Sequence, residues 1–431
     1  MSALRTPGVL PFVLGRLVSV LGRSMLSIAI GWQLYERTHS AFALGMVGLV
    51  QVVPVVGLVL LAGDLADRYP RKLIGAVTSV VQALVAVGLA VVSHTQAPVP
   101  FVYALLFVSG IATAFASPAI SALLPEMVPT TALVEVNAWS STALQLSATA
   151  GPAIAGLLLG LLKSATPLYV IEAVAALVFA LIVWRLPTKP RPVTARPRNA
   201  RDLRAGLHFV FRAKELLAAI TLDLFAVLLG GVTALMPIFA KDILKVGPHG
   251  LGLLLAAPSV GALITAMVQT RLPPWKRSGH VLLVSVAGFG LATLGFGFSR
   301  SFALSLGLLF LTGVFDALSV VIRRTLEQVL TPDRLRGRVG AVHHVFIGLS
   351  NELGEFESGT TAALLGPIGS VLLGGIGTLV IVAFAAVRWP TLRAMGRLDE
   401  MRPREDLARE VLGELEAETK DGHATGGPAV P

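Results

Sequence analysis

Three carboxylates stand in a segment where charged side chains are expensive. The stretch NELGEFESG, residues 351–359, carries Glu352, Glu355 and Glu357 between apolar runs rich in small residues. Glu352 and Glu355 share one face of a helix, whereas Glu357 points away from both. Two carboxylates so close in a medium of low dielectric constant cannot both stay ionised cheaply, so we expect at least one to hold a proton. Handling of protons or cations is one interpretation, and a structural contact with arginines or waters is the other.

Ionisable residues also fall inside other apolar segments, where each charge costs roughly 2.5–3.5 kcal/mol on insertion scales. Arg16 and Arg23 are seven residues apart, which places them on one helix face about 10 Å from each other. Arg16 could pair with Asp223, or the two side chains could reach separately toward lipid head groups. Glu172 lies in a further apolar segment. We take the following residues as candidates for a proton or substrate cavity: Arg16, Arg23, Asp223, Asp316, Glu352 and Glu355.

The whole chain has the composition of a membrane protein. Of its 431 residues, 54% are hydrophobic and 14% are charged, with a mean hydropathy of +0.77, whereas a soluble domain has about 25% charged residues. A membrane span needs about 20 mostly apolar residues. The segments that qualify are 9–34, 41–62, 73–93, 99–122, 138–160, 166–186, 216–239, 250–270, 280–298, 302–322, 340–362 and 366–387. We therefore predict an all-α membrane protein with twelve transmembrane helices.

Several functional classes are disfavoured by the sequence. The chain has no cysteine, which excludes disulfides and thiolate metal sites. It also lacks a catalytic triad pattern, a set of metal ligands and the G-x-x-x-x-G-K-[ST] phosphate loop, so ATP is not expected to drive it. We expect no enzymatic activity, no metal and no cofactor.

The basic residues predict the orientation in the membrane. With the N-terminus inside, 28 of the 35 Lys and Arg residues fall in cytoplasmic segments and 5 in outer loops. This bias places both termini in the cytoplasm of a multi-pass plasma-membrane protein, such as one of a bacterial inner membrane. The charge follows the inner rim instead of forming a nucleic-acid surface. We expect a monomer whose partners are the lipid bilayer, protons and a small-molecule substrate.

The two halves of the chain resemble each other. An offset of 203 residues lays SATAGPAIAG (147–156) over SNELGEFESG (350–359), and an offset of 207 near the start puts Leu44 on Leu251 and Arg16 on Asp223. Such matches favour an internal duplication, and two six-helix repeats suggest alternating access to a site between them. We predict an N-terminal half at 1–186, a cytoplasmic linker at 187–215, a C-terminal half at 216–388 and a cytoplasmic tail at 389–431.

A loop motif after the second predicted span is more specific. GDLADRYPRK resembles the cytoplasmic signature of the major facilitator superfamily, G-x-L-A-D-R-x-G-R-K, with Pro70 in place of the second glycine. In that family the motif holds the cytoplasmic helix ends together in the outward-open state. The resemblance implies a conformational latch made by Gly63, Asp67, Arg68, Arg71 and Lys72.

The fifth predicted span carries a second resemblance. SATAGPAIAGLLLG is similar to the antiporter motif of drug–proton exporters at Gly151, Pro152 and Gly156, while Ser147 and Ala155 stand where glycines are usual. The resemblance favours export over import. Physically, a Gly-Pro pair kinks a helix and allows close packing; a generic Gly/Pro membrane helix is the alternative.

TPDRLRGRVGA and GRLVSVLGRSM resemble the enterobactin-exporter-like branch of the superfamily, across most of residues 9–390. This implies a secondary active transporter that exports a siderophore-like or other hydrophobic small molecule by proton antiport. The chain departs from the exporters at Leu106, where their proton-linked arginine is usual. An importer or a lipid flippase of the same fold, and a non-transporting membrane sensor, are the alternatives.

Two further features stay open. Leu407, Val411 and Leu415 are spaced every four residues, which predicts a short amphipathic helix in the tail; a solvated tail without a role is the alternative. His343 and His344 lie near the inner end of the eleventh span and are either interfacial or part of a proton relay.

Overall fold

The computed structural model describes residues 6–187, 200–273 and 275–424, and every regular element within these ranges is helical. Eleven of the described helices are long and apolar enough to cross a membrane. The last of them lies in α13 (Asp333–Arg388), which is two helices joined at Gly366, with a φ of 79°, followed by Pro367. Glycine tolerates this φ and proline cannot continue the hydrogen-bond ladder. The described chain therefore has twelve spans, which confirms the predicted all-α membrane fold.

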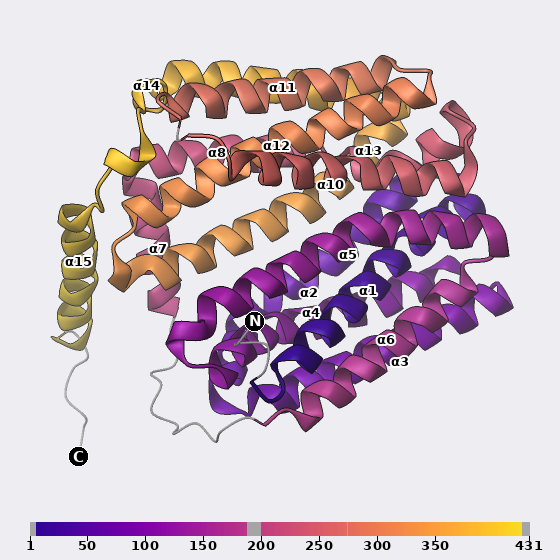
Figure 1. Cartoon of the computed structure of the whole chain (residues 1–431), viewed down its shortest axis with the longest axis horizontal. Coiled ribbons are helices and arrows are strands. Elements are labelled where there is room, and N and C mark those ends of the chain that lie inside the picture. The colour runs from indigo at the N-terminus through magenta and orange to yellow at the C-terminus, as the bar shows by residue number, and fades with distance from the viewer. Residues whose placement is uncertain (1–5, 188–199, 274, 425–431) are drawn as a thin grey trace.

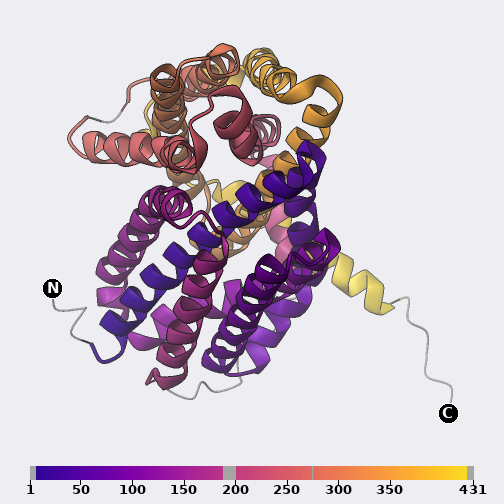
Figure 2. The ribbon, with the colours of Figure 1, turned by 90° about the vertical axis from the view of Figure 1, so that its right-hand side faces the viewer.

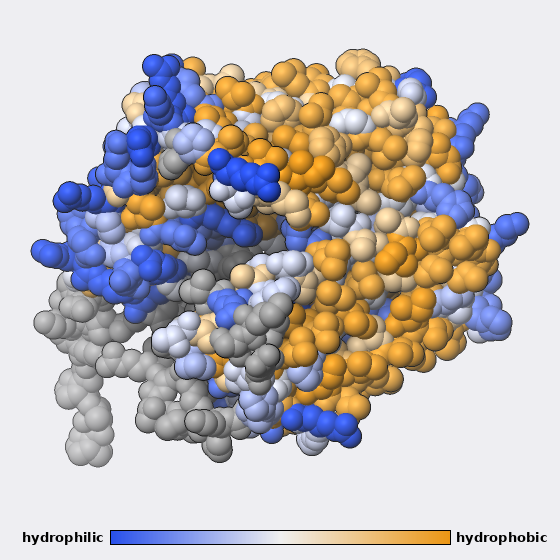
Figure 3. All heavy atoms as spheres, viewed as in Figure 1, coloured by the Kyte–Doolittle hydropathy of each residue, from blue (hydrophilic) through white to orange (hydrophobic). Residues whose placement is uncertain are grey.

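The membrane helices form two groups, which the views in Figures 1 and 2 separate. The N-terminal helices are α1 (Val9–Thr38), α2 (Ala41–Arg68), α3 (Arg71–Thr95), α4 (Val99–Met127), α5 (Leu133–Leu162) and α6 (Thr166–Arg185). The C-terminal helices are α8 (Lys214–Leu229), α10 (Gly247–Gln269), α11 (Ser278–Phe298), α12 (Phe302–Leu330) and α13. Large apolar side chains such as Leu84, Val284 and Leu364 are exposed, and hydrophobic residues cover the middle of the surface in Figure 3. Such a surface is suited to lipid.

The seventh span is interrupted, although the sequence predicts it as continuous. Helix α8 ends at Leu229, and after Gly230 and Gly231 the chain continues as η3 (Val232–Leu235), α9 (Met236–Ile238) and a π-helical turn, η4 (Phe239–Ile243). A Cβ at Gly231 would lie only 2.5 Å from the carbonyl oxygen of Gly354. Gly231 thus lets the backbone of α13 approach where the helix breaks.

Two glycine–glycine contacts join the two groups of helices. Gly45 of α2 packs on Gly359 of α13, and Gly252 of α10 packs on Gly156 of α5; a Cβ at any of the four would lie less than 3.0 Å from the backbone of the other helix. The offset of 207 carries Gly45 onto Gly252, and the offset of 203 carries Gly156 onto Gly359. The two contacts are therefore equivalent under the predicted duplication, as expected of two repeats that face each other.

These contacts lie at the end of the molecule where α1 ends and α2 begins, which we call the closed end. At the same end, the Tyr35 hydroxyl bonds to the Asp242 carboxylate, and Lys241 approaches Glu36 at 4.0 Å and the rings of Trp32 and Tyr35 at 5.9 Å. The opposite end carries α7 (Ala200–Arg212), and there a hollow separates the two groups in Figure 3. We call it the open end.

The predicted cytoplasmic linker contains a helix, α7, that the sequence interpretation missed. Phe209 and Val210 of α7 are buried, and a Cβ at Gly206 would lie 2.6 Å from the Arg338 carbonyl oxygen of α13. Because its apolar face has this partner, α7 packs against α13.

The tail is docked at the open end. It forms α14 (Pro390–Ala394), η5 (Leu398–Glu400) and α15 (Glu405–Ala424). Val411 is fully buried and Leu407 is partly buried, which confirms the amphipathic helix; the side chain of Leu415 lies outside the described part. Arg212 of α7 binds Glu410 and Glu414 of α15, each at 2.8 Å. The alternative of a fully solvated tail is therefore wrong.

The closed end should not tolerate a side chain at the glycine contacts. In Gly252→Val, the added Cβ would lie 2.6 Å from the Pro152 carbonyl oxygen, and backbone cannot move aside as a side chain can. We expect the closed end to separate by several ångströms. Because the chain has no cysteine, spin labels at Ser164→Cys and Ser301→Cys, both at exposed positions, measure this distance directly.

The matched control is Gly307→Val on α12, where an added Cβ meets nothing within 4 Å. It should leave the distance distribution unchanged. A Gly252→Val variant with the same distribution as the unmodified chain would show that the contact does not hold this end closed.

Candidate functional site

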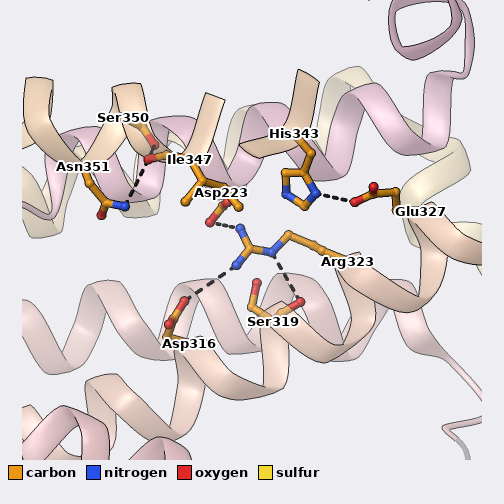
Figure 4. Close-up of polar contacts among 9 residues, drawn as sticks. All are labelled: Asp223, Asp316, Ser319, Arg323, Glu327, His343, Ile347, Ser350 and Asn351. Atoms are coloured by element: carbon orange, nitrogen blue, oxygen red, sulfur yellow. Dashed lines mark hydrogen bonds and ion pairs between the residues drawn. The ribbon is translucent and has the colours of Figure 1, made fainter. Parts of the chain in front are cut away.

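A buried arginine organises the charges of the C-terminal helices. Arg323 of α12 is only 5% exposed. Its guanidinium forms an ion pair with Asp223 of α8, lies 3.7 Å from Asp316, and donates through Nε to the Ser319 carbonyl at 3.4 Å (Figure 4). Arg323 directly follows the predicted span 302–322, but α12 continues to Leu330 and buries this arginine among the helices. Breaking a buried ion pair from one side leaves an uncompensated charge, so Asp223 and Arg323 depend on each other.

The spacing along α12 explains the cluster. Asp316, Arg323 and Glu327 are separated by seven and then four residues, so they lie along one helix face. Asp316 keeps 49% of its side chain exposed, whereas Asp223 keeps only 10%. A cavity of about 20 Å³ between Asp223, Asp316 and Ser319 is large enough for about one water molecule. The cluster is therefore buried at Asp223 and accessible to water at Asp316.

A histidine extends this line of polar groups. Nδ1 of His343, on α13, contacts the carboxylate of Glu327, and the His343 side chain is almost fully buried (Figure 4). Its Nε2 is buried and has no hydrogen-bond partner among the described residues. His343 is therefore packed inside the protein, and both the interfacial interpretation and the relay stay predictions. The side chain of His344 lies outside the described part.

The predicted Arg16–Asp223 pair is wrong. Arg16 donates to the Ser140 hydroxyl of α5 at 3.3 Å, while Asp223 is paired with Arg323. Asp223 finds its counter-charge within the C-terminal helices, so it needs none from α1. The other arginine of α1, Arg23, donates to Thr113 of α4 at 3.1 Å.

Glu352 and Glu355 lie where α13 crosses α2. A Cβ at Gly48 would be 2.6 Å from the carbonyl oxygen of Glu352 and 3.0 Å from the Cβ of Glu355. Among the described residues, neither carboxylate has a hydrogen-bond or ion-pair partner, whereas Glu357 accepts a hydrogen bond from Ser358 at 3.3 Å. The pair is therefore not a satisfied structural contact in this conformation. It lies in the contact between α2 and α13, which we call the seam. This contact must separate if the two groups of helices move apart at the closed end.

The loop motif binds α3 to α4. Arg71 binds Glu126, at the end of α4, at 2.9 Å and donates to the Ala66 carbonyl at 3.3 Å. Arg68 pairs with Asp64 at 3.0 Å, and Lys72 follows Arg71 in the first turn of α3.

The structure gives no contact that supports a latch role for two of the motif residues, Gly63 and Asp67. A Cβ at Gly63 would meet nothing within 4 Å, so no close contact requires glycine there in this conformation. The side chain of Asp67 lies outside the described part. The latch stays a prediction.

The second motif packs α5 on two neighbours. A Cβ at Gly151 would lie 2.6 Å from the Ser24 side chain of α1. The Pro152 carbonyl oxygen and Gly156 face Gly252 of α10. The described residues contain no group of three or more His, Cys, Asp or Glu that could hold a metal ion.

Comparisons with known proteins agree with this architecture. The family model described as a transmembrane secretion effector matches residues 9–422. The chain is 28% identical over 386 residues to enterobactin exporter EntS of Escherichia coli O1:K1 / APEC, covering 88% of this chain and 92% of the relative. The same figures hold for the enterobactin exporter EntS of Shigella boydii serotype 18.

Solved transporter structures share the fold. A bacterial homologue of the human lysosomal transporter Spinster, in an inward-facing and occupied conformation, superposes with a TM-score of 0.69 at 13% identity, over 89% of this chain and 96% of that one. A POT family transporter in complex with a thioalcohol-conjugated peptide gives a TM-score of 0.70 at 11% identity, with the same coverage of 89% and 96%.

The ion pair in the C-terminal helices should be needed for stability. Arg323→Gln leaves Asp223 buried without its partner, which should destabilise the protein by about 3–5 kcal/mol. Thermal unfolding of the purified protein in detergent measures this as a lower Tm. The double variant Asp223→Asn/Arg323→Gln should recover much of the loss, because it removes both charges.

Arg324→Gln is the control, since Arg324 is adjacent in sequence but exposed. Equal unfolding temperatures for Arg323→Gln and Arg324→Gln would contradict a stabilising Asp223–Arg323 pair.

Proposed function

The chain belongs to the transmembrane secretion effector family of the major facilitator superfamily, and from that premise we propose that it exports a siderophore-like or other hydrophobic small molecule in exchange for protons. It is a multi-pass membrane transporter, and its relatives are transporters and not enzymes. The proposal adds the driving ion, the direction of transport and the class of substrate.

The position of Glu352 and Glu355 carries the proton-coupling part. Both lie on α13 against Gly48 of α2, without a compensating charge among the described residues. Two neighbouring carboxylates in such a place are stable only if at least one of them is protonated. When α2 and α13 separate, water reaches the pair and a proton can be exchanged. Proton binding is thereby linked to the movement that opens the closed end.

The proposed direction is supported by the relatives, which are named as exporters, and the orientation gives the order of the steps. Under the positive-inside rule the open end faces the cytoplasm, so this conformation is the inward-facing one, with both termini inside. Substrate enters through the hollow, the open end closes, and the seam at the two glycine–glycine contacts opens to the outside. A proton taken up there and shared between Glu352 and Glu355 returns inward as the seam closes again.

The substrate class rests on the relatives and on the candidate cavity residues. The relatives are named as enterobactin exporters, and we extend to this chain only the broader class of siderophore-like or hydrophobic molecules. Asp316, on α12 of the C-terminal helices, is the half-exposed acidic candidate. Arg16, on α1, supplies a positive charge from the N-terminal helices. We assign both residues to contacts with the substrate, or with the water that fills the cavity before the substrate binds.

The latch role of Gly63, Asp67, Arg68, Arg71 and Lys72 is part of the same proposal. In the inward-facing state, the Arg71–Glu126 pair holds the loop to its own group of helices. The resemblance of the motif supports a second set of contacts in the outward-facing state, when the inner helix ends come together.

Neutral variants of the seam carboxylates test the proposal. In proteoliposomes, Glu355→Gln and Glu352→Gln should still exchange labelled enterobactin for unlabelled enterobactin, since neutral side chains mimic the proton-loaded state. Accumulation driven by a pH gradient should fall to a ratio of about 1, because no coupling between proton and substrate remains. An internal pH dye measures the proton flux in the same vesicles.

Glu357→Gln is the matched control, on the same helix but turned away from the pair. It should keep both exchange and gradient-driven accumulation. If Glu352→Gln and Glu355→Gln accumulate substrate as the unmodified protein does, the assignment of the proton to this seam is refuted.

A further inference from the structure

The N-terminal helices also contain a buried carboxylate. Glu172 of α6 is 2% exposed, and its Oε2 is buried without a hydrogen-bond partner in the described part of the chain. Gly22 of α1 leaves the space for it, since a Cβ there would lie 2.3 Å from this same oxygen. A buried carboxylate oxygen without a partner is rare in proteins and requires an explanation.

The nearby positive charge does not neutralise Glu172 directly. Arg23 follows Gly22 on α1 and acts electrostatically on Glu172, but the two do not form an ion pair in the described structure. Arg23 donates instead to the Thr113 hydroxyl at 3.1 Å, which also accepts from the Gln82 amide at 3.1 Å. Among the described residues, α3 and α5, the other helices packed on α6, bring no charged side chain to Glu172.

A chain of polar contacts runs from the closed end toward this site. Thr166, in the first turn of α6, bonds to Ser93 at 2.8 Å, and Ser93 accepts from the Gln33 amide at 2.6 Å. The Tyr169 hydroxyl then donates to Gln33 at 2.8 Å. Tyr169 is three residues before Glu172, which places the two on neighbouring turns of one helix face. This chain of hydrogen bonds ends at Gln33, eleven residues beyond Gly22 on α1, so it approaches Glu172 from the closed end without contacting the carboxylate.

We propose that Glu172 is a proton-binding site of the N-terminal helices, filled from the closed end, with Arg23 as the counter-charge that competes with the proton. This inference rests on the proposed function, because it adds a second site to the proton antiport. It differs from the seam pair in place and in access, since Glu172 lies inside one group of helices and not between the two.

The two positions open to Arg23 explain how such a site works. With a proton on Glu172, the side chain is neutral and Arg23 stays on Thr113, as observed. When the proton leaves, the ionised carboxylate attracts the guanidinium, and an ion pair replaces the hydrogen bond to Thr113. Glu172 is compensated in both states, by the proton in one and by Arg23 in the other, and the net charge of the site rises by one when the proton binds. An unpaired, ionised Glu172 at this depth would be strongly unfavourable.

A structural ion pair makes a different prediction. In that case Glu172 stays ionised beside Arg23 at every pH where the protein is folded. A proton site requires a protonated carboxyl group that titrates, and infrared spectroscopy detects it through the carboxylic C=O stretching band without any substrate.

The experiment compares the full-length protein in lipid nanodiscs with Glu172→Gln across a pH series. The seam pair and other carboxyl groups contribute to both series, so the signal is the difference between them. We expect in that difference a C=O band of Glu172 that disappears as the pH rises. In Arg23→Gln the same band should persist to higher pH, because the charge that favours the ionised form is gone. Glu414→Gln, at an exposed position of α15, is the control and should leave the band unchanged.

The inference is overturned if the spectra of Glu172→Gln and the unmodified protein have the same titrating band, or if the band does not respond to pH. It is also overturned if Arg23→Gln leaves the midpoint where it was. Glu172→Gln is neutral and close in shape to the original, and the Tm of each variant confirms that it is folded. The proposed function fails by a different result: an unmodified protein that moves enterobactin without moving protons.

Discussion

The close approach of backbones at two glycine–glycine contacts is the constraint on which the rest of the structure depends. Gly45 with Gly359, and Gly156 with Gly252, bring helices from the two halves together at the closed end, where a Cβ would collide with backbone. In lipid, where apolar side chains gain little by leaving their solvent, such close packing is a main source of helix association. The contacts are paired by the internal repeat, so both sides of the seam close and open together.

The buried charges are arranged differently in the two halves. Arg323 compensates Asp223 within the C-terminal helices, so this pair adds no net charge to the interior. Arg23 instead binds Thr113 and leaves Glu172 without an ion pair. Glu352 and Glu355 occupy the seam itself. The charges that have partners stabilise one half, and the carboxylates without partners are those to which we assign the protons in the proposed antiport.

Much of the architecture could be predicted from the sequence because hydropathy, positive charge and the repeat act over whole helices. The twelve spans and the tail helix follow from such patterns. Contacts between helices do not. The sequence could not show that α8 breaks at Gly230 and Gly231, since two glycines are also tolerated in a continuous membrane helix. Arg323 was missed because α12 extends further than its apolar run, although its spacing from Asp316 and Glu327 was a usable signal. The Arg16–Asp223 pair was a reasonable inference from the repeat, but Asp223 has a closer partner in its own half.

Alternating access joins these observations into one account, in which the end that is closed here opens when the hollow end closes. The most direct test is a pair of spin-label distances in a chain that has no cysteine to remove: one pair across the closed end and one across the open end, followed as the pH is lowered and enterobactin is added. The account predicts opposite changes, with the closed-end distance growing as the open-end distance shrinks. Two distances that stay constant, or that change in the same direction, would contradict it.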